Sequence, residues 1–213
     1  MTPLRVTLRA EGPSDDMLLP IIRWALHRHL GEIPIDDRLA DTRRLRETPH
    51  TLAEKIAAAE RLFPCDVLFI HLDADKDPLL KRQQIASAAV ELRAEGFDTP
   101  HVCVIPVRES EAWLLIDEAA IREAAENRRG KVKLHLPSRK KLETVADPKA
   151  ALDELIRTAS ELTGRAWDKF IGRFRPFWVA DCIADFSPLL DLPAFRAFDA
   201  DVKAFAESWE PDA

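Results

Sequence analysis

Four carboxylates in two short motifs have the residue types and spacing of a divalent-metal site. Glu11 and Asp15 belong to the first motif, Glu-Gly-Pro-Ser-Asp, and Asp73 and Asp75 form the second, Asp-Ala-Asp. Carboxylates that are brought together repel one another unless a cation lies among them. Oxygen ligands without a neighbouring His or Cys cluster favour Mg²⁺ or Mn²⁺ over zinc. The motifs therefore predict a Mg²⁺ (or Mn²⁺) site with Glu11, Asp73 and Asp75 at its core.

Each motif also has a simpler structural explanation. Aspartate is common in the turns that follow strands, so the Asp-Ala-Asp motif on its own is compatible with turn formation. Ser14 is equally suited to cap a helix, and Asp15 to interact with the positive end of the helix dipole. The occurrence of both motifs after strand-like segments favours the metal site over turn formation alone.

The segments that precede the two motifs have strand patterns. Residues 4–10 alternate between apolar and polar side chains, and residues 66–72 form a nearly continuous apolar run. Such a run is typical of a strand that is buried on both faces of a parallel sheet. Ligand sites in open α/β sheets form beyond the carboxyl ends of the strands. We therefore expect Glu11 and Asp73 to converge although they are distant in sequence.

The other segments of the first half alternate between helix and strand patterns. A third strand is expected over residues 101–107, and residues 38–46 allow an additional edge strand. Helices are expected over residues 15–30, 51–63, 78–94 and 111–125. This order predicts an α/β fold with an open, mostly parallel sheet, right-handed crossovers and helices on both sides.

The character of the sequence changes after residue 127. A basic linker is followed by helical patterns, which are interrupted at three prolines. The expected helices cover residues 148–162, 166–174, 179–186 and 194–209. The sequence therefore predicts two parts, an α/β domain over residues 1–127 and a basic helical section over residues 128–213 that packs on it.

Charge is distributed unevenly between these parts. The chain has a net charge of −6, yet residues 128–175 contain 13 Lys and Arg against 6 Asp and Glu. A metal-dependent nuclease needs carboxylates for its cation and a separate basic surface for phosphates. The candidate nucleic-acid contacts are Lys140, Lys141, Arg173 and Arg175. Alternatively, these cations belong to ordinary solvated helix faces.

The two acidic motifs resemble the signatures of a known family. Glu-Gly after the first strand and Leu-Phe-Ile-His-Leu-Asp-Ala-Asp at residues 68–75 are similar to the signatures of Toprim domains, which occur in topoisomerases, primases and OLD-type nucleases. The segment at residues 107–117 and the helical tail resemble small stand-alone Toprim-like proteins of bacteria. The resemblance implies a Toprim-like α/β sheet with a helical C-terminal section.

The resemblance also implies roles for individual residues. Asp73 and Asp75 would bind Mg²⁺, and Glu11 would bind a metal or act as a general base toward water. Asp15 and Glu111 would complete a second metal site, as the Glu11 to Asp15 spacing is similar to that of OLD-type nucleases. Two metals together stabilise the attacking and leaving oxygens of a phosphodiester displacement.

Some positions stay open, and some features of the family are missing. Glu109 is an alternative to Glu111, because the sequence does not settle which of them points inward. His71 lies on the buried strand and is interpreted as a core histidine. The chain lacks a Gly-x-x-x-x-Gly-Lys-Ser/Thr ATPase motif, and it contains no tyrosine for topoisomerase-type strand passage.

We therefore expect a Mg²⁺-dependent nuclease that cleaves DNA or RNA, with bacterial defence as the context that the resemblance suggests. The alternative is a non-catalytic Toprim-like subunit that binds nucleic acid or a nucleotide and works through a partner, such as an ATPase or another protein. Three cysteines without a Cys-x-x-Cys pair favour a reducing cytoplasm. No apolar run is long enough to predict a membrane span.

Overall fold

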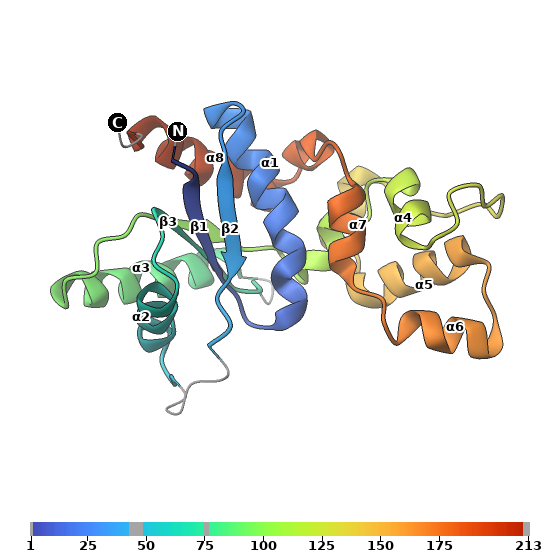
Figure 1. The fold of residues 1–213 in the computed structure, drawn as a ribbon, viewed down its shortest axis with the longest axis horizontal. Helices are drawn as coiled ribbons and strands as arrows, with labels where there is room; N and C mark the ends of the chain where they lie inside the picture. Colours follow the sequence, from blue (N-terminus) through green and yellow to red (C-terminus); the bar gives the residue numbers. More distant parts are fainter. Residues whose placement is uncertain (1, 43–48, 75–76, 211–213) are drawn as a thin grey trace.

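Four parallel strands form the sheet that positions the acidic motifs. The computed structural model describes residues 2–42, 49–74 and 77–210. The strands are β1 (Leu4–Arg9), β2 (Ile35–Leu39), β3 (Val67–His71) and β4 (His101–Val104), in the order β2-β1-β3-β4 (Figure 1). Every neighbouring pair is parallel, so all four carboxyl ends lie at the same edge. The expected open parallel sheet is confirmed. Its additional edge strand is β2, which begins before residue 38, while residues 43–48 of the expected segment lie outside the described residues.

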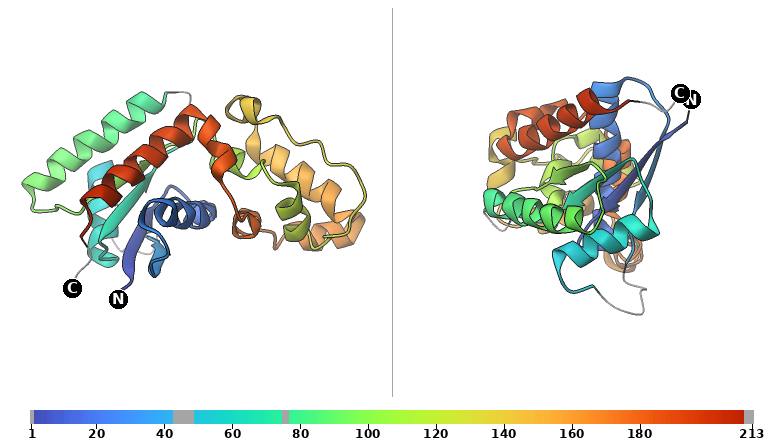
Figure 2. Two further views of the ribbon diagram at one scale, coloured as in Figure 1. Left: turned by 90° about the horizontal axis from the view of Figure 1, so that it is seen from above. Right: turned by 90° about the vertical axis from the view of Figure 1, so that its left-hand side faces the viewer.

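Helices cover both faces of this sheet. One face packs against α1 (Leu18–Leu30) and α8 (Pro193–Ser208), and the other packs against α2 (Leu52–Leu62) and α3 (Pro78–Ala94) (Figure 2). The alternation of side chains along a strand explains the division. Phe69 of β3 belongs to the core on the α1 and α8 side, whereas Leu68 and Ile70 belong to the core on the α2 and α3 side.

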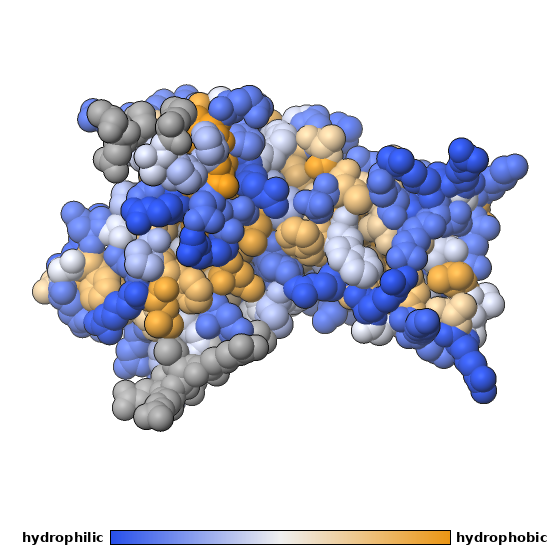
Figure 3. Space-filling model, in the orientation of Figure 1, coloured by the Kyte–Doolittle hydropathy of each residue, from blue (hydrophilic) through white to orange (hydrophobic). Residues whose placement is uncertain are grey.

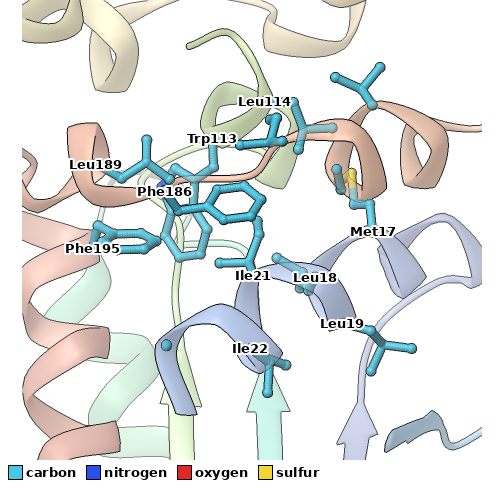
Figure 4. Packing of buried hydrophobic residues seen from close by; sticks show 14 of the residues in the cluster. Met17, Leu18, Leu19, Ile21, Ile22, Trp113, Leu114, Phe186, Leu189 and Phe195 are labelled. Atoms are coloured by element: carbon cyan, nitrogen blue, oxygen red, sulfur yellow. The ribbon is translucent and has the colours of Figure 1, made fainter. Parts of the chain in front are cut away.

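The remaining helical segments form a lobe beside the sheet (Figure 1). They are η2 (Ser110–Leu114), α4 (Glu118–Ala124), η3 (Arg139–Thr144), α5 (Pro148–Ser160), α6 (Gly164–Ile171), α7 (Pro176–Cys182) and η4 (Ser187–Asp191), whereas the short η1 (Pro13–Met17) joins β1 to α1 at the sheet. A single hydrophobic core joins the lobe to the sheet, and in it Ile21 of α1 lies beside Trp113, Phe186 and Phe195 (Figure 4). Within the described residues, no helix is both long and apolar enough to cross a lipid bilayer.

The main departure from the expected elements is the segment at residues 111–125. It forms η2 and α4 with a break between them, because Asp117 starts a new helix by accepting hydrogen bonds from the backbone N–H groups of Ala119 and Ala120. The apolar residues Ala112 to Leu115 before the break, which include Trp113 and Leu114, are buried. Its hydrophobicity reflects burial in the shared core and not one continuous amphipathic helix.

Candidate metal site

Asp73 is held just beyond the carboxyl end of β3 by backbone hydrogen bonds to the neighbouring chain. Leu72 N–H donates to the carbonyl of Val104 at 3.2 Å, and Ala74 N–H donates to the carbonyl of Pro106 at 3.0 Å. These two bonds continue the pairing of β3 and β4 past the ends of both strands. Asp73 therefore projects at the edge where the sequence predicts the site. Asp75, the other acid of the motif, lies outside the described residues.

The Glu-Gly turn after β1 is shaped by Asp15. Its Oδ2 atom accepts hydrogen bonds from the backbone N–H groups of Glu11 at 3.0 Å and of Gly12 at 2.8 Å. Asp15 is thus partly used to hold the turn, whereas the Glu11 side chain is exposed. Within the described parts of the chain, the hydrogen bonds of Asp15 all use Oδ2, so its Oδ1 is open to a ligand there. Both the turn-forming and the metal-binding explanations of Asp15 are compatible with this geometry.

Asp73 lies in a strongly negative environment. Burial and then the charges of Glu11, Asp15, Glu111 and Glu109, in that order, raise its pKa from the ordinary 3.8 to about 7. Its side chain is 34% exposed, but its Oδ1 atom is buried and has no hydrogen-bond partner among the described residues. The described acids Glu11, Asp15, Glu111 and Glu109 are thus near enough to influence Asp73 electrostatically, and one oxygen of Asp73 has no donor among the described residues.

His71 lies next to Asp73 and Asp15 in the same region. It is 1% exposed, and its Nδ1 atom lies 3.0 Å from the carbonyl oxygen of Val104, so Nδ1–H is the donor of that hydrogen bond. Its Nε2 atom lies 3.6 Å from Asp73 Oδ1, 3.9 Å from Asp15 Oδ2 and 3.4 Å from the hydroxyl of Ser110. Burial lowers the pKa of His71 although the Asp15 charge opposes this shift. His71 is the buried histidine that the sequence predicts, and it also forms part of the site wall.

Glu109 and Glu111 have different surroundings. Glu109 Oε2 accepts a hydrogen bond from the backbone N–H of Lys149 at 3.1 Å, in the first turn of α5. Glu111 is 7% exposed, and burial raises its pKa. Glu111 also raises the pKa of Asp73 more than Glu109 does. Glu109 therefore helps to attach α5, which leaves Glu111 as the better candidate ligand of the two.

The donor set suits a cation that keeps part of its water shell. Within the described residues, no three His, Cys, Asp or Glu side chains are placed so that they could enclose a metal ion. Mg²⁺ does not need such a cage, since it is usually bound by one or two carboxylates together with waters and substrate phosphates. The unpartnered oxygen of Asp73, inside a group of repelling carboxylates, fits a hydrated Mg²⁺ of this kind.

The four basic residues that the sequence singles out fall into two classes. Lys140 and Lys141 are exposed on η3 and form no ion pair within the described parts of the chain. Arg173 pairs with Glu126 at 2.7 Å, and Arg175 pairs with Asp16. The outer end of the helical lobe is mostly hydrophilic on the face seen in Figure 3. Two of the four expected nucleic-acid contacts, Arg173 and Arg175, therefore already form ion pairs with acidic residues of the same chain.

Arg9 is a part of the site region that the sequence analysis missed. It is the last residue of β1 and is only 6% exposed, although its place in an alternating strand suggested an ordinary polar position. Its Nη1–H donates to the carbonyl of His71 at 3.1 Å. Burial lowers its pKa, and the charges of Glu11 and Asp15 oppose that shift. The sequence feature that could have indicated a role for Arg9 in the site is its position two residues before Glu11, at the start of the Glu-Gly turn.

Comparisons of the chain with protein-family models, with curated proteins and with solved structures give no significant match. The resemblance to Toprim domains therefore rests on sequence segments alone, and a fold class does not by itself define an activity. What the chain does has to be inferred from the chemistry of the site.

Proposed function

We propose that this protein is a Mg²⁺-dependent nuclease of the Toprim-like kind, which cleaves phosphodiester bonds in DNA or RNA. The observation that carries the proposal is the environment of Asp73. Its carboxylate stands at the carboxyl end of a central strand and has a buried oxygen without a partner among the described residues. Burial, and then the charges of neighbouring carboxylates, raise its pKa to about 7. Such a group gains most from a bound cation, because the cation relieves the repulsion and replaces the missing donor.

The residues of the site would divide the work of hydrolysis. Asp73, together with Asp75 of the same motif, would hold the cation, and Glu111 would be a ligand of a second cation. When bound, Mg²⁺ supplies Lewis-acid polarisation of a phosphoryl oxygen. Glu11, which is exposed beside the cluster, would take the proton of the attacking water. Asp15 would fix the turn that carries Glu11, and its free Oδ1 would be available to a second cation.

Two observations favour a second candidate, a non-catalytic subunit that binds nucleic acid or a nucleotide and acts through a partner protein. The carboxylates of the described residues are not arranged as a closed metal cage. In addition, Arg173 and Arg175 are paired within the protein, which reduces the basic surface that is free to hold a long strand. A partner, such as an ATPase, would then supply what this chain lacks.

The deciding experiment is a cleavage assay with purified protein on plasmid DNA, single-stranded DNA and RNA, with Mg²⁺, with Mn²⁺ and with EDTA. We expect metal-dependent cleavage that falls by about a hundredfold or more in Asp73→Asn, since loss of a catalytic electrostatic group has costs of this order. Asp98→Asn is the matched control, because Asp98 is an exposed acid before β4, at the opposite edge of the sheet.

The outcomes separate the two candidates. Cleavage that survives in Asp73→Asn, or that proceeds equally in EDTA, would exclude the proposed metal site. Binding of nucleic acid without cleavage under any of these conditions would favour the non-catalytic subunit.

A further inference from the structure

A pocket lies beside the carboxylate cluster, between the carboxyl ends of β1 and β2 and the helix α2. Its volume is about 150 Å³, and its walls include Arg9, Glu11, Asp41 and Lys55. Pockets that enclose a whole small-molecule ligand are larger, roughly 300 to 1,000 Å³. The pocket is therefore of a size for a small group, such as a phosphate with part of its sugar, and it opens next to Glu11.

Arg9 gives this pocket a buried cation with unused hydrogen-bond donors. A guanidinium has five N–H donors. Within the described residues, the structure gives Arg9 a single hydrogen bond, from Nη1 to the carbonyl of His71. Arg9 as a residue is 6% exposed, and it lines the pocket. The remaining N–H groups of Arg9 are not among the buried unpartnered atoms of the described residues, so they stay accessible to solvent and to an acceptor that enters the pocket.

Lys55 of α2 supplies a second cation to the lining of the pocket. It is half-buried on α2, and its ammonium forms no ion pair within the described ranges. Arginine offers a planar fork that matches the oxygens of a phosphate, and lysine adds a point charge. Two cations in one lining, one of them on a buried residue, favour a phosphate over an apolar group as the occupant of the pocket.

We propose that this pocket binds a phosphate group of the nucleic-acid strand or nucleotide that is presented to the carboxylate cluster, with Arg9 as the buried anchor and Lys55 as the outer contact. This inference rests on the proposed function, because the phosphate is taken to belong to the substrate of that function. It names the phosphate as the part of the substrate that is recognised, through its charge and geometry and not through its base.

The negative charge of Glu11 affects how tightly a phosphate binds in the pocket. Glu11 carries negative charge beside the pocket that it lines, so it opposes a phosphate when no cation is bound. Removing the charge of Glu11 should therefore strengthen phosphate binding in the absence of metal, whereas the same change should abolish the proposed cleavage. Opposite effects of one substitution distinguish the phosphate pocket from the catalytic proposal.

The test is direct binding of thymidine 5′-monophosphate and of thymidine to the full chain in EDTA, measured by calorimetry or by NMR titration. We expect the monophosphate to bind at least about tenfold more tightly than thymidine, because a hydrogen bond to a charged group contributes about this much. Lys55→Gln should weaken binding of the monophosphate by about tenfold, and Arg9→Lys should weaken it by a similar factor, since the fork is lost.

The matched control is Lys203→Gln, which makes the same charge change on α8 and should leave binding unaltered. Arg9 is buried, so the folding of its variant is checked by circular dichroism, and Lys55→Gln and Glu11→Gln carry the test if that variant is unstable. Equal binding of thymidine and its monophosphate, or full affinity in Lys55→Gln, would overturn the phosphate pocket even if the cleavage assay succeeds. The predicted binding pattern without cleavage in Mg²⁺ would support the pocket and reject the nuclease.

Discussion

Arg175, at the start of α7, forms an ion pair with Asp16, the residue that follows Asp15 in the turn of the candidate site. Burial raises the pKa of Asp16, and the charge of Arg175 opposes that shift. The other carboxylate oxygen of Asp16 is buried without a hydrogen-bond partner among the described residues. The helical lobe is therefore attached to the acidic turn through an ion pair, and the charge of Arg175 contributes to this contact within the protein.

Arg175→Gln should destabilise the protein more than Arg173→Gln does. Removing Arg175 leaves the partly buried Asp16 without its partner, so a loss of about 1 kcal/mol in the free energy of unfolding is expected. Arg173 and Glu126 are both exposed, and such surface pairs contribute within about 0.5 kcal/mol. Urea unfolding of both variants at pH 7 gives the comparison. Equal losses would show that the Arg175 pair is no more than a surface contact.

Lys140 and Lys141 are the better test of a nucleic-acid surface on the helical lobe. Neutralising both to Gln should weaken binding of unrelated sequences to the same degree, because phosphate contacts carry no base information. Each lost contact should reduce the salt slope of log affinity by about 0.7 to 0.9. Titrations at several salt concentrations measure this. If the affinity for nucleic acid and its salt slope were unchanged in the double variant, these lysines would belong to a solvated face that does not contact nucleic acid.

Local patterns were sufficient to predict the sheet and the place of the acidic motifs. Alternation in residues 4–10 and the apolar run before Asp73 are properties of single strands, and parallel order then brings their carboxyl ends to one edge. The surroundings of individual side chains depend on distant segments, which local patterns do not specify. Arg9 is buried because α2 and β3 both pack against β1, the strand that carries it. Arg175 is paired with Asp16 because α7 packs on η1.

Mg²⁺ should stabilise the wild-type protein against heat, and the gain should depend on pH. A ligand at a hundred times its dissociation constant adds about 2.7 kcal/mol to the stability of the folded state. Protons compete with the cation for Asp73, whose pKa is about 7, so the gain should be large at pH 8 and should shrink as pH falls below 7. Thermal melts across this range with and without Mg²⁺ measure it. No gain at pH 8 would mean that the cluster has no useful affinity for the metal.

Asp73→Asn should make the metal-free protein more stable at neutral and higher pH. The pKa of Asp73 is raised from 3.8 to about 7 in the folded state, so the folded protein binds this proton more tightly than the unfolded chain does. Ionising Asp73 therefore costs stability as pH rises from about 4 to 7, and the loss is complete above pH 7. Asparagine carries no charge and does not suffer this loss.

The size of the gain is limited by solvent. One pKa unit corresponds to about 1.4 kcal/mol, but the Asp73 side chain is 34% exposed, and screening by water reduces the effect. We expect the variant to exceed wild type by about 1 to 2 kcal/mol at pH 8 in EDTA and to match it near pH 4. Asp98→Asn, at an exposed acid, should show no such dependence. A constant difference between Asp73→Asn and wild type across pH 4 to 8 would contradict the raised pKa, and with it the electrostatic argument for a cation at Asp73.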